Sequence, residues 1–148
     1  MSYNPRNPNG QATMANSEPV VIASDQTPIN VTVQATISGG ATVFHLVSAG
    51  TTNATVVKNT AAKLVGYYLF NSNTLPRKIA FHNSATLPVA GAGILFTIVL
   101  PGLAGANVAL PTGIDFSAGL AITTTADIPD AGTTPVALND LVINLFYK

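Results

Sequence analysis

The stretch Asp140-Leu-Val-Ile-Asn-Leu-Phe-Tyr147, which we predict to be a strand, decides the fold class. On an extended backbone, one side carries Leu141, Ile143, Leu145 and Tyr147, and the other side carries Val142, Asn144 and Phe146. Successive side chains of a β-strand point to opposite faces, so an apolar period of two residues predicts a strand with one buried face.

The same period, or a short run of β-branched residues, recurs along the rest of the chain. Strands are predicted at residues 29–37, 41–47, 54–58, 63–70, 77–82, 93–100, 107–110 and 120–125. Turn residues separate them at intervals of roughly ten residues, which is typical of all-β proteins. No segment combines a helical apolar period with capping residues. We therefore expect an all-β fold, an antiparallel β-sandwich that is jelly-roll-like and carries an extended N-terminal arm.

Two strands carry more specific predictions. Gly66 lies inside a strand, where a glycine indicates a bulge or a close approach of another backbone. Residues 93–100 are the most apolar strand, and we expect them at the centre of the core. The apolar run over residues 89–100 is too short for a helical membrane crossing, which needs about 20 residues, and Pro88 and Pro101 bound it. No membrane span is expected.

Residues 1–29 differ in composition from the remainder. They are rich in Asn, Pro, Ser and Gln, and their apolar patch at residues 20–22 is too short to form a core. Such a segment gains order by pairing its backbone with the sheet edge of a neighbour. We expect an arm over residues 1–29 and a β-sandwich domain over residues 30–148. The arm residues predicted to bind the partner are Tyr3, Pro19, Val20, Val21, Ile22 and Ile29.

The charge content points to assembly. Of 148 residues 47% are hydrophobic, but only 8% are charged, where about a quarter is usual. A free soluble protein covers itself with charged side chains, so we expect much of this surface to be buried in a homo-oligomer, with a trimer favoured and a dimer next. Six basic and six acidic residues give no net charge, which argues against nucleic-acid binding.

The side chains that usually perform chemistry are few and scattered. Cysteine is absent, and His45 and His82 are the only histidines, so a multi-histidine metal site within one chain is excluded. We expect both histidines to be structural or surface residues. No two carboxyls are placed for acid and base catalysis. Asp130 and Asp140 are expected to accept local amide hydrogen bonds at turns, and Asp127 with Asp130 lacks the dense acidic spacing of a calcium loop. The sequence predicts no enzyme and no catalytic, cofactor-binding or metal-binding residue.

Two small clusters have alternative interpretations. Tyr67, Tyr68 and Phe70 form either part of the core, with one tyrosine outward, or an aromatic platform for a glycan or a base. The core interpretation is favoured because aromatic residues are scarce in the chain, at 7%. Arg77 and Lys78 are expected to form a small exposed basic spot that contacts an acidic patch on a neighbouring subunit.

The N-terminal segment resembles a connector found in virion proteins of tailed bacteriophages. Residues 10–29 contain Asn16-Ser-Glu-Pro-Val-Val-Ile-Ala-Ser-Asp-Gln26, and in those proteins a phrase of the form N-S-x-P-V-V-I-A-S-D-Q precedes the folded part. The remainder is similar to a β-domain of many phage structural proteins, which have no assigned activity. The resemblance is carried by Lys63-Leu-Val-Gly-Tyr-Tyr-Leu-Phe-Asn71, Gly113-Ile-Asp-Phe-Ser-Ala-Gly-Leu-Ala-Ile122 and Asn139-Asp-Leu-Val-Ile-Asn-Leu-Phe-Tyr-Lys148.

The resemblance implies a structural protein of the virion. A small domain with one arm suits a capsid decoration or cement protein, which binds the major capsid protein on the outer capsid surface and bridges its subunits. The alternative is a tail-fibre or head-fibre component whose tip recognises a host surface glycan. The chain has no long shaft, coiled coil or repeat, which weakens the fibre interpretation.

Overall fold

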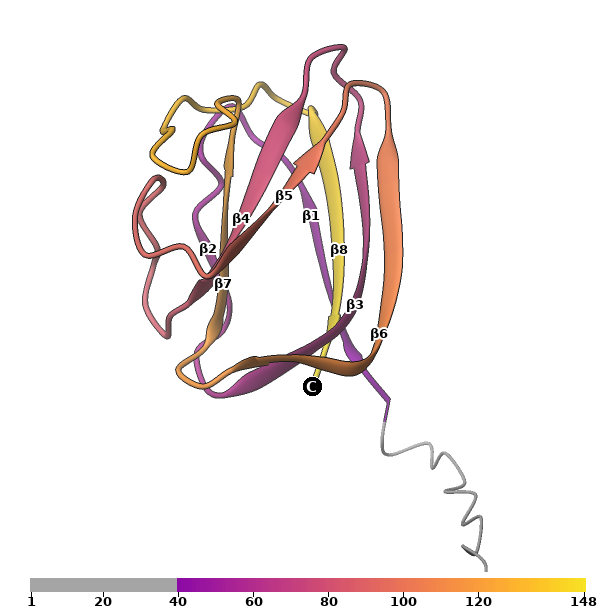
Figure 1. The fold of residues 1–148 in the computed structure, drawn as a ribbon, viewed down its shortest axis with the longest axis vertical. Coiled ribbons are helices and arrows are strands. Elements are labelled where there is room, and N and C mark those ends of the chain that lie inside the picture. The colour runs from indigo at the N-terminus through magenta and orange to yellow at the C-terminus, as the bar shows by residue number, and fades with distance from the viewer. Residues whose placement is uncertain (1–39) are drawn as a thin grey trace, which may run out of the picture. The chain divides into compact units, whose positions relative to one another are not determined.

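A computed structural model describes residues 40–148, which form two four-stranded β-sheets packed face to face (Figure 1). The strands are β1 (Thr42–Val47), β2 (Thr55–Lys58), β3 (Ala62–Asn71), β4 (Arg77–Asn83), β5 (Phe96–Leu100), β6 (Gly105–Phe116), β7 (Leu120–Thr125) and β8 (Leu141–Tyr147). This part of the chain contains no helix long and apolar enough to cross a membrane. The predicted all-β sandwich is confirmed.

Several predictions lie outside the described residues. They are the extended arm over residues 1–29, the strand over residues 29–37, and the partner-binding residues Tyr3, Pro19, Val20, Val21, Ile22 and Ile29.

The strand order is that of a long hairpin folded back on itself. The first sheet has the order β1-β8-β3-β6, and the second sheet has the order β2-β7-β4-β5. A single hairpin would pair β1 with β8, β2 with β7, β3 with β6 and β4 with β5, and all four pairs are present and antiparallel. Eight strands wrapped in this way are a jelly roll, as the sequence predicted.

The inward faces of the two sheets enclose one apolar core. Alternate residues of β3 and β8 are fully buried, among them Leu69, Ile143 and Leu145. Phe81 of β4 stacks on Phe96 of β5, with the ring centroids 4.4 Å apart. Full burial of a side chain of this size contributes about 1.5–3 kcal/mol, so this interior is the main source of stability.

The most apolar predicted strand is not the centre of the core, and that prediction was wrong. Only Phe96–Leu100 forms a strand, and β5 lies at the edge of the second sheet, where it pairs with β4 alone. Val99 is 42% exposed. A high apolar content indicates that at least one face of a strand is buried. It does not indicate whether the strand lies at the centre or at the edge of its sheet.

The glycine at position 66 marks a bulge, as predicted. Leu64 pairs with Ile114, but Gly66 pairs with Ala109, so the single intervening residue of β3 faces residues 110–113 of β6. Both strands bend toward the second sheet at their lower ends in Figure 1. A Cβ atom at Gly66 would lie 2.9 Å from the carbonyl oxygen of Val108. The bulge also explains why β6 extends well beyond the predicted residues 107–110.

The chain covers the outer face of the second sheet with its own loops. The β4–β5 and β7–β8 loops lie on the outer side of β4 and β7 in Figure 1. The outward-facing residues of these two strands are all buried: Lys78, Ala80, His82, Ala121, Thr123 and Thr125. Both faces of β4 and β7 are therefore buried, as in the centre of a layered protein.

Two polar side chains attach these loops to the sheet. His82 contacts the β4–β5 loop through Nδ1, which lies 3.1 Å from the carbonyl oxygen of Gly93, while its Nε2 lies 2.9 Å from Thr123 Oγ1. The Lys78 ammonium donates to the carbonyl oxygens of Pro129 and Asp130 in the β7–β8 loop. A carbonyl can only accept, so Nδ1 of His82 carries the proton. His82 is structural, as predicted.

The bulge gives a first testable prediction. Gly66→Ala places a methyl group against the Val108 carbonyl, and we expect it to lower the free energy of unfolding by about 1–3 kcal/mol. Gly50→Ala is the matched control, because the nearest atom to its Cβ, the amide nitrogen of Leu138, is 3.9 Å away. Urea unfolding measures both variants. Equal losses for the two would contradict the steric explanation.

The buried imidazole gives a second prediction. Burial lowers the pKa of His82 below its ordinary value, and hydrogen bonds with the backbone of Gly93 and Ala92 offset only part of this effect. The unfolded chain therefore takes up a proton more readily, so this part of the stability is complete above about pH 6.5 and is lost as the pH falls. Urea unfolding at about pH 7.5 and pH 5.5 measures this loss. His82→Gln, which does not titrate, should show a smaller difference between the two pH values; an unchanged difference would exclude His82 as the cause.

Candidate interaction surface

No loop of the described chain covers the outer face of the first sheet. The strand registers align its outward residues in three rows that each cross β1, β8, β3 and β6. The rows are Val43, Phe146, Gly66 and Ala109; His45, Asn144, Tyr68 and Asn107; and Val47, Val142, Phe70 and Gly105. We call this set of residues the striped face, because two apolar rows flank one polar row.

In the apolar rows, aromatic rings lie beside glycines. Position 66 has room for the ring of Phe146, whose Cδ2 would be 3.5 Å from a Cβ there. In the same way, Cδ2 of Phe70 would be 3.3 Å from a Cβ at Gly105. A ring that covers a cross-strand glycine is half-buried by the backbone and stays flat on the sheet. The rows end at the β1 edge in exposed valines.

The polar row has a fixed hydrogen-bond pattern on one side. Nδ1 of His45 lies 2.8 Å from Asn144 Oδ1, and Asn144 Nδ2 donates to the carbonyl oxygen of Tyr68 at 3.4 Å. An amide oxygen only accepts, so Nδ1 of His45 is the donor. Tyr68 stands next to this pair and is 46% exposed. His45 is thus a surface residue, as predicted.

The aromatic cluster divides between the two faces of β3. Tyr67 packs against the core and Tyr68 points outward, as the prediction of one outward tyrosine requires. Phe70 is half-buried on the outer face, where it extends the apolar row, and is not part of the core. The preference for core packing therefore holds for Tyr67 and fails for Phe70, because the bulge before Gly66 sets which residues of β3 face inward.

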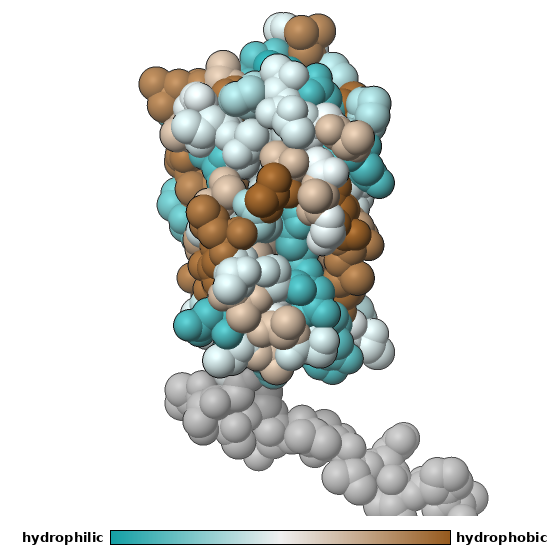
Figure 2. Space-filling model, turned by 90° about the vertical axis from the view of Figure 1, so that its left-hand side faces the viewer, coloured by the Kyte–Doolittle hydropathy of each residue, from teal (hydrophilic) through white to brown (hydrophobic). Residues whose placement is uncertain are grey.

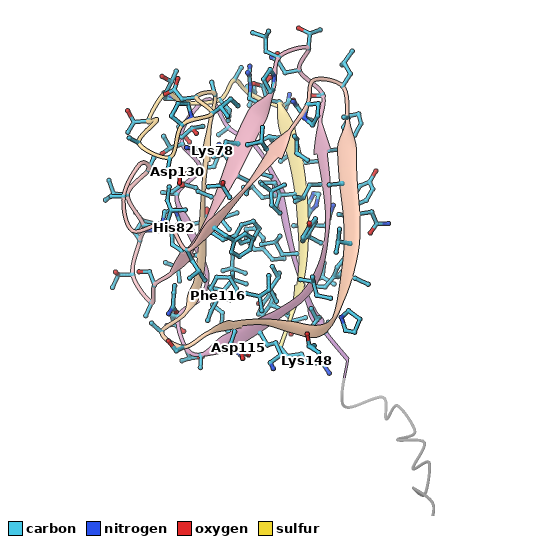
Figure 3. The ribbon with its side chains drawn as sticks, viewed as in Figure 1. Lys78, His82, Asp115, Phe116, Asp130 and Lys148 are labelled. Carbon is cyan, nitrogen blue, oxygen red and sulfur yellow. The ribbon has the colours of Figure 1, made fainter. Side chains whose placement is uncertain are left out.

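The striped face contains no charged residue. Among residues 40–148 the charged side chains that reach solvent are Lys58, Lys63, Asp115, Asp127, Asp130 and Lys148. Lys63 pairs with Asp115, with Nζ 3.1 Å from Oδ1. Asp115 and Lys148 lie at the lower end of the sandwich in Figure 3, and Asp130 lies on the β7–β8 loop. Charge is thus confined to one end of the domain and one loop.

The loop side is different in character. Figure 2 views this side and shows apolar groups in brown interspersed with pale and teal polar groups. Leu87 and Val89 are exposed there, at 67% and 71%, but the charged Asp127 and Asp130 belong to the same side. A shallow pocket of about 250 Å³ is lined by residues that include His82. Both nitrogens of His82 already have structural partners, the carbonyl oxygen of Gly93 and the hydroxyl of Thr123, so this imidazole serves the fold.

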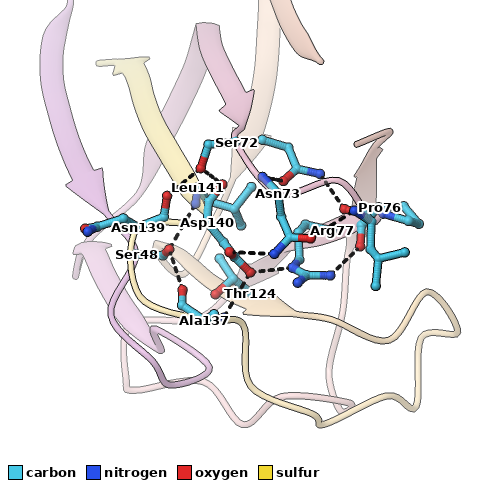
Figure 4. A network of polar contacts seen from close by, with 12 residues as sticks. Ser48, Ser72, Asn73, Pro76, Arg77, Thr124, Ala137, Asn139, Asp140 and Leu141 are labelled. Atoms are coloured by element: carbon cyan, nitrogen blue, oxygen red, sulfur yellow. Dashed lines mark hydrogen bonds and ion pairs between the residues drawn. The ribbon is translucent and has the colours of Figure 1, made fainter. Parts of the chain in front are cut away.

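Arg77 and Lys78 do not form an exposed basic spot, and that prediction was wrong. Arg77 is 7% exposed and Lys78 is 1% exposed. Nε of Arg77 donates to Oδ2 of Asp140 at 2.6 Å (Figure 4). The prediction failed because both side chains are buried against partners distant in sequence, which are Asp140 for Arg77 and the carbonyl oxygens of Pro129 and Asp130 for Lys78.

Asp140 is the centre of the polar network in Figure 4. Its carboxylate accepts hydrogen bonds from Asn73 Nδ2 at 2.9 Å, from Arg77, and from the amide of Ala137 at 3.0 Å. The local bond to Ala137 is the turn role that the sequence predicted. The network joins the β3–β4 turn, the start of β4 and the residues that precede β8. It positions β8 between its two neighbours.

The acidic side chains of the described residues have structural roles. No group of three or more His, Cys, Asp or Glu side chains within residues 40–148 could hold a metal ion. Asp127 accepts the amide of Thr134 at 2.8 Å, and Gly132 donates to Pro129 at 2.9 Å, so these residues form the β7–β8 loop. What the first sheet offers is an uncharged surface, the striped face.

Comparison with known proteins finds no family model, no curated protein and no solved structure that matches the chain. Any function must therefore be argued from the sequence and the geometry of this domain.

The Arg77–Asp140 pair gives a third prediction. Burial raises the pKa of Asp140, but hydrogen bonds from Asn73, Arg77 and Ala137 together with the charge of Arg77 outweigh burial and hold the pKa below its ordinary value. This stabilisation is present above about pH 4 and is lost as the pH falls through the lower folded value. Asp140→Asn leaves a buried guanidinium without its counter-charge, and we expect it to cost about 3–5 kcal/mol in urea unfolding.

Asp115→Asn is the matched control for this prediction. It breaks the Lys63–Asp115 pair, whose side chains are 45% and 77% exposed, and exposed pairs contribute at most about 1 kcal/mol. A loss for Asp140→Asn no larger than that of the control would show that the network does not position β8.

Proposed function

We propose that this chain is a non-enzymatic structural protein of a tailed-bacteriophage particle, a capsid decoration or cement protein. In this proposal it binds the major capsid protein on the outer capsid surface and bridges neighbouring capsid subunits. The proposal rests on the resemblance of residues 10–29 to phage connector segments and on the nature of the striped face.

The striped face is the observation that carries the proposal. An uncharged face can be buried against a partner without the cost of removing ions from water. Its two apolar rows supply area that is favourable to bury, at about 25 cal/mol per Å². Its polar row supplies side chains that fix the register of the partner by hydrogen bonding. Free monomers rarely leave such a surface uncovered.

The jelly-roll topology supports the same class of function without deciding it. Jelly rolls build viral capsid domains and also lectin domains, and a fold alone does not determine a function. In a cement protein each contact can be weak, because many linked contacts over a closed shell hold by avidity. The predicted arm, with Tyr3, Pro19, Val20, Val21, Ile22 and Ile29, would supply a second contact of this kind.

A second candidate function is a fibre tip that recognises a host surface glycan. The position of Tyr68 favours it, because this exposed ring lies between Asn107 and Asn144 in the polar row. An aromatic ring flanked by amides offers a sugar both a stacking surface and hydrogen bonds. Both functions use the same face, so they are separated by the partner that it binds.

A binding experiment on phage particles gives the fourth prediction. Tyr68→Lys puts an ammonium in the middle of the striped face, and we expect the fraction that co-sediments with virions of the encoding phage to fall at least about tenfold, a loss of about 1.4 kcal/mol or more. Val89→Lys is the matched control, since Val89 is 71% exposed on the loop side, and it should bind like the unaltered chain. Equal binding of the two variants would contradict the proposed docking face.

Two further measurements separate the candidate functions. A cement protein is present in many copies per particle by gel densitometry, whereas a fibre tip is present in few. A glycan array with the full chain should show no binding that depends on Tyr68. Binding to an array together with a low copy number would replace the cement proposal by the fibre tip.

A further inference from the structure

Within residues 40–148, strand β1 forms an edge of the first sheet and has none of the usual protection. Exposed edges invite pairing with another strand, and proteins guard them with charges, prolines, bulges or very short strands. The sequence of β1, Thr-Val-Phe-His-Leu-Val, contains no charge, proline or glycine. Its six residues pair with β8 without a register shift. At its two ends Val43 is 59% exposed and Val47 is 44% exposed.

The other three edges each carry a protecting feature. β6 contains Pro111 and the bulge, and Gly113 has a φ of 71°. β2 has only four residues and a register shift before Lys58. β5 has five residues and ends immediately before Pro101. Within residues 40–148, β1 is therefore the edge best suited to accept a further strand.

We propose that β1 pairs with β1 of a second copy of this chain. The two strands run antiparallel about a two-fold axis at His45, so that Val43 lies opposite Val47 of the other copy and His45 lies opposite His45. The two first sheets become one continuous eight-stranded sheet. The inference concerns the protein's own assembly and does not depend on a role in a phage particle.

The polarity of the striped face selects this partner and this register. In the proposed register, the apolar row that contains Val43 continues into the apolar row that contains Val47 of the second copy. The polar row continues through both His45 side chains. A shift by one residue would turn apolar residues to the wrong face. A shift by two residues would put Val43 opposite His45 and break the rows. The edge is thus complementary to itself, as an isologous contact requires.

The inward side of the strand fits the same register. Phe44 and Leu46 both pack against the core, and the proposed pairing sets Phe44 opposite Leu46 of the second copy. Both cores then continue across the new strand pair. An antiparallel edge contact closes with two copies, so the edge favours a dimer over the predicted trimer.

The absence of cysteine from the chain permits a clean disulfide test of the register, which is the fifth prediction. Paired residues of antiparallel strands have Cα atoms about 4.5–5.5 Å apart, within the range that a disulfide spans. His45→Cys alone should therefore form a covalent dimer under mild oxidation. Val43→Cys alone should form no disulfide, because residue 43 would be about 13 Å from residue 43 of the second copy. The same holds for Val47→Cys alone. A mixture of these two variants should form a disulfide between residue 43 of one copy and residue 47 of the other.

Light scattering on the full chain tests the dimer itself. We expect twice the mass of the 15.1 kDa chain. His45→Lys places two ammonium groups at the two-fold axis and should give a monomer that keeps its circular dichroism spectrum. Asn107→Lys, at the other end of the same row, is the matched control and should stay dimeric. A monomeric or trimeric unaltered chain, or cross-linking by Val43→Cys alone, would overturn the proposal.

Discussion

The register of β8 between β1 and β3 is the constraint on which the rest of the first sheet depends. It sends Leu141, Ile143 and Leu145 into the core and aligns the outward residues of four strands in three rows. A slip of one residue would exchange the two faces of the sheet. Asp140 and its partners lie at the start of β8, so the buried ion pair with Arg77 acts at the point where that register begins.

The scarcity of charge is more marked on the surface than in the composition. Arg77, Lys78 and Asp140 are buried and serve the fold, which leaves the ionic side chains of the domain at one end and on one loop. The second sheet is covered by the β4–β5 and β7–β8 loops, and no loop within residues 40–148 covers the first sheet. The outer face of the second sheet is therefore buried by loops of the same chain, whereas the outer face of the first sheet is available to a partner.

The sequence predicts those features of the fold, such as strands and bulges, that depend on residues close together along the chain. Alternation located β8 and β3, and the glycine at position 66 marked the bulge. It could not locate β5 in the sheet order, because an edge strand and a central strand can be equally apolar. It also misplaced Arg77 and Lys78, since the burial of Lys78 depends on the β7–β8 loop folding over β4 and the burial of Arg77 depends on its contact with Asp140. Asn71 was missed for the same reason: its side chain bonds the carbonyls of Leu75, Leu100 and Pro101 from within the structure.

The pairing of the first described strand with the last has a consequence for how the protein is made. His45 and Asn144 are bonded across 99 positions of sequence, and β8 is a central strand of its sheet. Contacts so distant in sequence form slowly because a long loop must close first. On the ribosome the first sheet stays incomplete until residues 141–147 have emerged. Until then the nascent chain exposes apolar strands, and premature termination before Leu141 would release a polypeptide without the middle of its sheet.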